Sequence, residues 1–196
     1  MLDQLKIKIK RHWRRFAVSD RGVTAVEFVM VAPLMFYTLS VTMEVFIMQF
    51  AQSQITAAVE DVARTVRTGA AQMSAVNATT FKSNICAILG SNFNCAGLNV
   101  YVGSDTSFAN LVANTPPVLT IGPKTDATVT PAKACYSPGS PKSPAIVIAT
   151  YDWYFATPGL GTIIGNIAGN TGKRMSATTL FQNQNYPGSA TAITQC

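Results

Sequence analysis

Hydrophobic positions in the first part of the chain predict one membrane-spanning helix. An uncharged run, FVMVAPLMFYTLSVTM, extends from Phe28 to Met43. As a helix this run measures about 24 Å, and with its flanks it reaches the roughly 30 Å of the hydrocarbon layer. We therefore expect a transmembrane segment over residues 23–47. Pro33 within it predicts either a kink that a membrane helix tolerates or a hinge, and both interpretations stay open.

Apolar positions continue at helical spacing beyond that segment. They recur three, four or seven residues apart with polar side chains around them: Val45, Met48, Ile55, Val59, Val62 and Val66. This is the period of an amphipathic helix, so we expect one helix from Val23 to about Thr68, with Gly69 as its C-terminal cap. At about 69 Å the helix is far longer than a bilayer requires. Residues 48–69 are therefore expected to pack on another part of the protein.

The pattern changes after Gly69 to short elements separated by turns, and every proline except Pro33 follows residue 115. We expect a helix over residues 78–89 and strands over 98–102, 117–121, 145–155 and 174–182. Alternation is clearest in the third strand, where one face carries Ile146, Ile148, Thr150, Asp152 and Tyr154, and the other carries Val147, Ala149, Tyr151, Trp153 and Phe155. Residues 70–196 are therefore predicted to form a small antiparallel sheet packed by one face on a helix, which makes the chain α+β.

Basic residues are concentrated before the apolar run. Residues 1–22 carry seven bases against Asp3 and Asp20, which supplies +5 of the formal net charge of +6. The bases are Lys6, Lys8, Lys10, Arg11, Arg14, Arg15 and Arg21. Because Lys and Arg stay on the cytoplasmic side of membrane segments, the N-terminus is expected inside and residues 70–196 outside. This position argues against nucleic-acid binding, and the lack of a good A-x-A site after Met43 argues against a cleaved secretory signal.

Residue inventory argues against an enzyme. His12, in the leader, is the sole histidine, which excludes a His-based triad, a His general base and a His-containing zinc site from the exported region. The acids after residue 69 are Asp105, Asp126 and Asp152, and no motif positions two of them for glycoside hydrolysis. We expect no catalytic activity, no cofactor and no small-molecule substrate.

A glycine-rich stretch, GLGTIIGNIAGNTGKR, invites comparison with a phosphate-binding loop. The comparison fails because the expected first glycine is Ile167 and because Lys173 is followed by Arg174 rather than Ser or Thr. We interpret the stretch as an apolar loop or short helix. The alternative is a lipid-contacting or subunit-contacting patch built on Leu160, Ile163, Ile164 and Ile167.

All four cysteines fall in the region expected outside the cytoplasm: Cys86, Cys95, Cys135 and Cys196. An even number in a small exported domain predicts two disulfides, for which three pairings exist. We favour Cys86 with Cys95, closing a short loop, and Cys135 with Cys196, fixing the C-terminus. No C-x-x-C pair is present, so a metal site is not expected.

Glu27 places a carboxylate at the start of the apolar run, five residues after Gly22. A charge at the centre of a span costs roughly 2.5 to 3.5 kcal/mol, and less near the edge. Leader, glycine, glutamate and immediate apolar helix together resemble the class III signal of type IV pilin-like proteins, in which a membrane aspartyl peptidase cuts after the glycine on the cytoplasmic face. The other interpretation is that Glu27 lies among the lipid headgroups.

Longer stretches narrow the resemblance to one family. RRFAVSDRGVTAVEFVMVAPLMF and FAQSQITAAVEDVARTVRTG, over about residues 14–70, look like the TadE-like minor pseudopilins of the tight adherence (Flp pilus) system. Family members typically carry a later acid in this helix, here Glu44. KRMSATTLFQNQNYPG is similar to the family's closing strand, although Gln184 and Asn185 stand where Glu and Pro would be expected.

The resemblance implies a cut between Gly22 and Val23 by a prepilin peptidase. Glu27 would then pair with the new N-terminal amine of a neighbouring subunit. The implied location is the bacterial inner membrane, and the implied partners are the membrane, the peptidase and the other pilins and pseudopilins that assemble Flp pili for surface adherence and biofilm formation. A single-span anchored binding module or adhesin without a pilus role is the alternative function.

Overall fold

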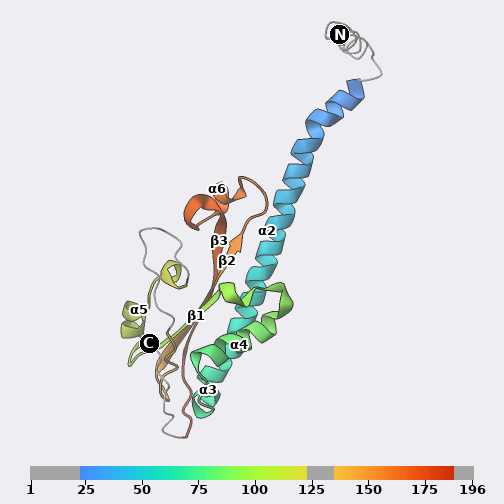
Figure 1. Ribbon diagram of the computed structural model, residues 1–196. Helices are drawn as coiled ribbons and strands as arrows, with labels where there is room; N and C mark the ends of the chain where they lie inside the picture. The colour runs from blue at the N-terminus through green and yellow to red at the C-terminus, as the bar shows by residue number, and fades with distance from the viewer. Residues whose placement is uncertain (1–22, 123–134, 188–196) are drawn as a thin grey trace, which may run out of the picture. The chain divides into compact units, whose positions relative to one another are not determined.

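The computed structural model describes residues 23–122 and 135–187 of the 196-residue chain. The chain divides into two compact units, Met1–Met43 and Glu44–Cys196. Helix α2 (Val23–Arg67) contributes to both units, and the other described elements belong to the second (Figure 1). A long helix followed by short helices and an antiparallel sheet confirms the predicted α+β class. The first unit ends inside the predicted membrane segment 23–47, whose boundary stays a prediction.

In the first unit, α2 presents large apolar side chains at its surface. Exposed fractions of these side chains between Val26 and Met43 range from 43% to 77%. The hydroxyl groups of Thr38, Ser40 and Thr42 donate hydrogen bonds to carbonyl oxygens three or four residues earlier in the helix. Because these donors are satisfied within the helix, the surface suits an apolar solvent. Among the described helices, the one over Thr24–Arg67 is long and apolar enough to cross a membrane.

In the second unit, the rest of α2 forms the centre of the core. The predicted apolar positions from Met48 to Val66 are buried, and Val45 is half-buried. Helix α4 (Ala78–Leu89) has the predicted bounds and packs Phe81 and Ile85 into the same core. Its N-terminus is capped by the Asn77 side chain, which accepts a hydrogen bond from the Thr80 N–H (2.8 Å). The hydrophobic period therefore fixes which helix faces are inside.

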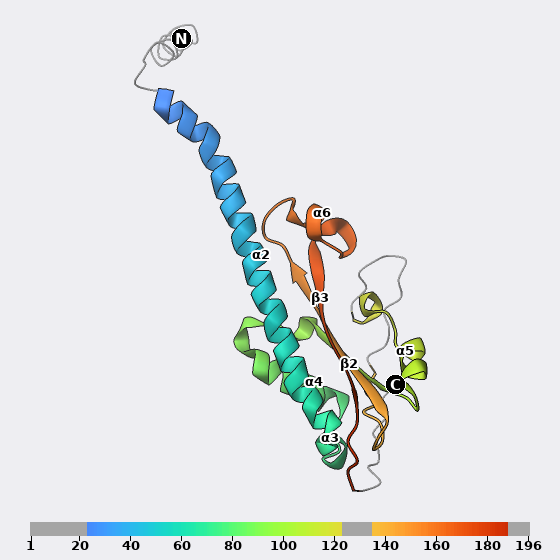
Figure 2. The ribbon, with the colours of Figure 1, turned by 180° about the vertical axis from the view of Figure 1, so that it is seen from behind.

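Three antiparallel strands form one sheet in the order β1-β2-β3 (Figure 2). Their bounds are β1 (Leu98–Ser104), β2 (Pro144–Tyr154) and β3 (Gly172–Gln182). The face that carries Val147 and Ala149 joins the core of α2 and α4, as the alternation predicts. The opposite face carries Ile146 and Ile148, which pack in a second cluster.

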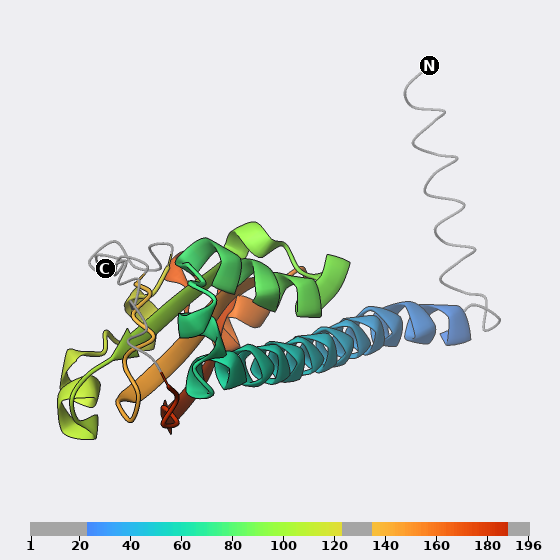
Figure 3. The same cartoon turned by 90° about the horizontal axis from the view of Figure 1, so that it is seen from below.

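That opposite face is also covered, which the sequence did not predict. Helix α5 (Phe108–Asn114) lies on the other side of the sheet from α2 (Figure 3). It contributes Leu111 to the second cluster, and Ile121 joins it there. Two-sided burial explains why β2 is almost entirely buried from Pro144 to Thr150.

The predicted strand over residues 117–121 is wrong. Residues Val118–Thr120 form a 3-10 turn, η4. The N–H groups of Thr120 and Ile121 donate to the carbonyls of Pro117 and Val118, so they are used within the turn. The preceding Pro116 and Pro117 have no N–H to offer a sheet, which favours the turn over a paired strand.

The remaining short elements connect these layers. They are α3 (Ala70–Met73), η2 (Gly90–Asn92), η3 (Cys95–Gly97), α6 (Leu160–Ile164) and η5 (Ala168–Asn170). Cys86 of α4 and Cys95 of η3 form the predicted disulfide, with Cα atoms 6.0 Å apart. Cys135 is disulfide-bonded as well. Its predicted partner, Cys196, lies outside the described residues.

Candidate functional site

The predicted processing segment stands at the start of the described chain. Helix α2 begins at Val23, the residue that follows the predicted cut. Gly22 lies outside the described residues, as do Lys6, Lys8, Lys10, Arg11, Arg14, Arg15 and Arg21. Glu27 is exposed on the second turn of the helix, beside Val26 and Phe28, which are 59% and 63% exposed. Its carboxylate makes no hydrogen bond or ion pair with the described residues, so it is open to a partner from outside them.

Pro33 lies inside α2, and the helix is continuous through it. The carbonyl of the residue four positions earlier loses its usual donor there, because proline has no N–H. Whether this position bends the helix or acts as a hinge stays a prediction.

Glu44 attaches α2 to the loop that follows β2. The Ala156 N–H donates to one carboxylate oxygen of Glu44 (2.6 Å), and the Thr157 N–H donates to the other (2.9 Å). Charge-assisted hydrogen bonds of this kind are shorter and stronger than neutral ones. The acid that the sequence analysis singled out in the helix is therefore, in this structure, an attachment point within the second unit.

The loop held by Glu44 leads into α6, the apolar stretch of the sequence. Gly159 precedes α6 with a φ of 81°, a left-handed conformation that glycine adopts without strain. Leu160 and Ile167 are buried, while Ile163 is 77% exposed. The short-helix interpretation is confirmed, and much of the proposed apolar patch faces the domain rather than its surroundings.

A buried ion pair links β2 and β3. Asp152 and Arg174 are register partners, and the guanidinium donates through Nε (2.5 Å) and Nη2 (2.6 Å) to the two carboxylate oxygens. Arg174 Nη1 also donates to the carbonyl of Ile121 (3.0 Å), which accepts a further hydrogen bond from the Thr150 hydroxyl (3.0 Å). Both charges are thus paired where an isolated one would be costly. The pair connects the sheet to the segment that covers its second face.

The other acids after residue 69 are Asp105 and Asp126. Hydrogen bonds from the Asn114 side chain and the Thr106 N–H hold the pKa of the Asp105 carboxyl below its usual range. Asp126 lies outside the described residues. Within the described ranges, no group of three or more His, Cys, Asp or Glu residues is placed to hold a metal ion.

The closing segment after β3 returns to the end of α2. The Gln184 N–H donates to the Arg67 carbonyl (2.8 Å), and the Asn183 side chain donates to the Pro138 carbonyl (2.9 Å). The side chains of Gln184 and Asn185 are exposed. The departure from the Glu-Pro pattern of the family therefore falls on residues whose side chains face outward, while a backbone N–H makes the contact.

Sequence reasoning missed the partners of the two structural acids. The amides that bind Glu44 belong to Ala156 and Thr157, more than a hundred residues away in the chain. Arg174 was assigned to a strand without a role. One signal was present, because Asp152 falls on the same alternating face as Ile146 and Ile148 and hence needs a buried counter-charge.

Comparison with known families identifies the N-terminal helix. Residues 22–64 match the model of the family described as TadE-like protein. The match begins at the glycine of the predicted cut and covers nearly all of α2, so the predicted resemblance is confirmed over this helix. The search of curated proteins and the search of solved structures found no match to the chain.

Proposed function

Taking the TadE-like helix as the premise, we propose that the protein is a minor pseudopilin, cut between Gly22 and Val23, that takes part in the assembly of Flp-type pili for surface adherence. The observation that carries this proposal is a coincidence of three positions. The family match starts at Gly22, the basic leader ends just before it, and Glu27 follows five residues later at the start of an apolar helix. A cut there would remove the charged leader and leave the apolar helix as an anchor.

Glu27 supplies the chemistry for assembly. Cleavage would create an ammonium group at Val23 of each subunit, and the Glu27 carboxylate is exposed and available to such a group on a neighbour. Opposite charges attract strongly in a medium of low dielectric constant, whereas either charge alone is penalised there. A carboxylate that is costly when alone and stabilised when paired would set the register of one subunit against the next.

The proposed location is the bacterial inner membrane, with the N-terminus in the cytoplasm and the second unit outside. Two observations support this topology. The bases before α2 supply most of the net charge, and the Cys86–Cys95 disulfide suits an oxidising compartment. The prepilin peptidase and the other pilins and pseudopilins of the system are the partners that follow from the proposal.

N-terminal sequencing of the membrane-extracted protein tests the proposal directly. We expect a chain that starts at Val23 in cells with an active prepilin peptidase and at Met1 in cells without it. Gly22→Val should block the cut, because a side chain at this position would crowd the peptidase, whereas Thr24→Ser serves as a matched control that should still be cut. A chain that starts at Met1 in the presence of the active peptidase would leave the anchored binding module or adhesin as the function.

A further inference from the structure

Among the described residues, no strand pairs with the outer edge of strand β3. It is a terminal strand of the sheet, and its register with β2 runs without a bulge from Gly172 to Gln182. Alternate residues of β3 direct their N–H and C=O groups away from β2. Ser176 shows this direction, because its carbonyl accepts a hydrogen bond from the Gln52 side chain of α2 (2.7 Å). Thr178 and Leu180 have the same orientation as Ser176, since the period of a strand is two.

The open part of the edge is short and has attachments on both sides. The Gln52 side chain donates a hydrogen bond to the Ser176 carbonyl, and the Gln184 N–H donates one to the Arg67 carbonyl. Between them, the outward backbone groups of Thr178 and Leu180 make no hydrogen bond with any described residue. The edge sequence SATTLFQ contains no charge and no proline, the devices that proteins commonly use to prevent strand addition.

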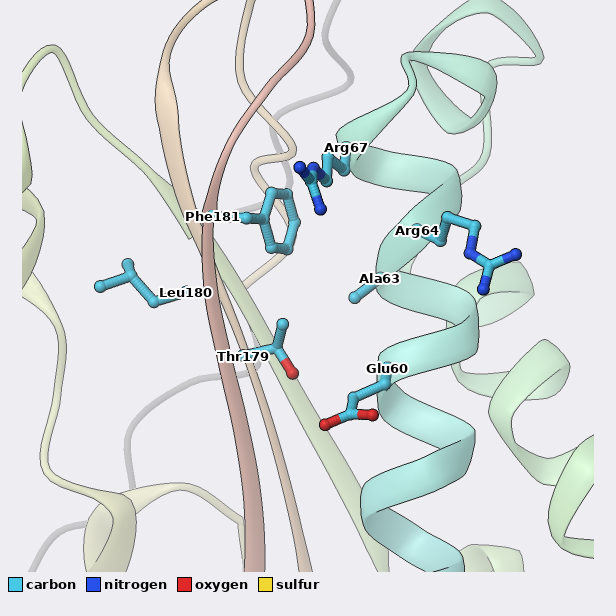
Figure 4. Close-up of a pocket in the computed structure, with 7 residues that line it drawn as sticks. All are labelled: Glu60, Ala63, Arg64, Arg67, Thr179, Leu180 and Phe181. Carbon is cyan, nitrogen blue, oxygen red and sulfur yellow. The ribbon is translucent and has the colours of Figure 1, made fainter.

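A groove runs between this edge and the last turns of α2 (Figure 4). It encloses about 250 Å³ and is lined by Glu60, Ala63, Arg64 and Arg67 of α2 and by Thr179, Leu180 and Phe181 of β3. In Figure 4, Phe181 points toward α2 and the Arg67 side chain extends toward it, while Glu60 points toward Thr179. Arg64 points away from β3 in the same view. The groove thus has an acidic end at Glu60 and a basic end at Arg67.

We propose that β3 receives an extended segment of another protein as a fourth strand, with an acidic side chain of that segment at Arg67. Backbone pairing along Thr178 and Leu180 would supply affinity, and the groove would supply specificity. Charge selects the orientation, because Glu60 repels a carboxylate at one end and Arg67 attracts it at the other. Leu180, which is 49% exposed on the opposite face of the sheet, would be covered by an apolar side chain of the same segment.

A second copy of the chain is a poorer occupant than an extended acidic segment. Pairing of β3 with the β3 of a second copy would bring the uncharged sequence SATTLFQ to the edge, and this sequence offers no acid to Arg67. The proposal does not depend on whether the chain is cut at Gly22.

A peptide selection tests the proposal with the full chain in detergent micelles. The probe is a randomised octapeptide library, and selected peptides are then measured by fluorescence anisotropy. We expect enriched peptides with alternating apolar residues and an acid near one end. Replacing that acid by Lys should weaken binding about two- to fivefold, the effect of a solvent-exposed ion pair. Enrichment of no peptide, or of peptides that bind equally with Lys, would overturn the proposal.

Variants separate strand addition from general charge attraction. Leu180→Pro removes the outward N–H without removing a hydrogen bond to β2, so the domain should fold and bind peptide at least about tenfold more weakly. Arg67→Glu should reverse the preference from acid to Lys, and it leaves the backbone carbonyl that holds Gln184 in place. Arg64→Glu is the matched control, since it makes the same charge change on a side chain that points away from β3. Equal effects at Arg64 and Arg67 would contradict the assigned acid position.

Hydrogen–deuterium exchange gives an independent measurement on the wild-type protein. The N–H groups of Thr178 and Leu180 should exchange fast in the free protein and slowly with bound peptide. Those of Thr179 and Phe181, which point toward β2, should be slow in both states. Peptide binding that leaves the exchange of Thr178 and Leu180 unchanged would show that the peptide binds elsewhere and would refute strand addition.

Discussion

The acids Glu44, Asp152 and Glu27 differ in what stabilises their carboxylate charge. Glu44 accepts two backbone N–H groups, and Asp152 is paired with a buried guanidinium. Glu27 has neither kind of partner among the described residues, although it lies at the start of the apolar helix. Because an unpaired charge beside lipid is penalised, the partner of Glu27 is expected to come from another molecule or from a group created by processing.

Glu27→Gln tests that expectation by removing the charge and keeping the side-chain size. We expect the variant to insert and to be cut as the wild type is, but to assemble no pili, because the amide cannot form the ion pair. Pili are counted by electron microscopy and adherence by surface attachment. Met30→Leu, at a site that is 77% exposed on the same helix, is the control and should assemble normally. Normal piliation of Glu27→Gln would remove the pairing role.

Arg174→Met should strongly destabilise the second unit. The substitution leaves the Asp152 carboxylate buried without its counter-charge and takes one donor from the Ile121 carbonyl. Loss of one partner of a buried pair costs roughly 3 to 5 kcal/mol, measured here as a lower midpoint of denaturant unfolding. Lys173→Met, at the neighbouring and more exposed position, should change the unfolding free energy by less than about 0.5 kcal/mol. Similar midpoints for the two variants would contradict the structural role of the pair.

The burial of Tyr136 predicts that the protein loses stability at alkaline pH. Burial raises its pKa to about 12 from the usual 10.0, and its hydroxyl has no hydrogen-bond partner among the described residues. A pKa raised by folding means that the stabilising effect is complete below pH 10 and is lost as the pH rises toward 12. The free energy of unfolding should fall over that interval by up to about 3 kcal/mol through this residue.

Tyr136→Phe isolates this contribution, because the phenylalanine ring cannot titrate. Its unfolding free energy should decline less than that of the wild type between pH 10 and pH 12. Tyr154→Phe is the control, since Tyr154 is 63% exposed, and it should follow the wild-type profile. Parallel pH profiles for wild type and Tyr136→Phe would show that the phenol is not the titrating group.

At the scale of elements, the features that depend on residues close together in the sequence could be predicted. The bounds of α4 agree with the prediction, and α2 ends within one residue of it, because caps and hydrophobic period are local signals. The two faces of β2 were also predicted from alternation. The turn at Val118–Thr120 was not predicted. Ile121 beside it packs on the second face of the sheet, and alternation within β2 does not show that this face is covered.

Parts of the site depended on pairing across the chain and could not be predicted. The Cys86–Cys95 disulfide was predictable from its short loop. The Asp152–Arg174 pair requires the register of β2 with β3, and the contacts of Glu44 require the path of the loop after β2. Alternation indicates that Asp152 faces a buried side, but spacing within the sequence identifies neither its partner nor the amides that bind Glu44.

Gly69 marks the junction of α2 with the closing segment. Its φ is +83°, and the ring of Tyr186 occupies the space in which a Cβ atom would lie. Gly69→Ala should therefore lower the unfolding free energy by more than the roughly 1 kcal/mol expected of Ala at an open left-handed position. Gly169→Ala supplies that reference, because Gly169 has a φ of +79° and a ψ of 9°, and the nearest atom to the place that its Cβ would take lies at an ordinary contact distance of 3.7 Å.

A double variant distinguishes the steric term at this junction. The cost of Gly69→Ala should be smaller in a Tyr186→Ala background, since the ring that collides with the added methyl group is gone. Unfolding midpoints of the wild type, the two single variants and the double variant form the measurement. An equal cost of Gly69→Ala with and without the ring would assign the whole effect to backbone strain.

At the scale of the whole molecule, leader, anchor and disulfide make one prediction about topology. Alkaline phosphatase fused after Cys196 should be active, because the enzyme matures only outside the cytoplasm. Replacing Arg14, Arg15 and Arg21 by Glu should lower that activity, since the positive flank that fixes the orientation is removed. Activity is compared with fusion-protein level on immunoblots. A fully inactive wild-type fusion would place the second unit in the cytoplasm and contradict the exported domain.

The attachments at the two ends of residues 44–67 also have a mechanical consequence. Glu44 holds the loop after β2 at one end of this helical segment, and Arg67 holds the segment after β3 at the other. A tensile force along the helix would load both attachments and the packed side chains between them in shear, simultaneously rather than one after another. A domain loaded in this way would resist separation from its own helix.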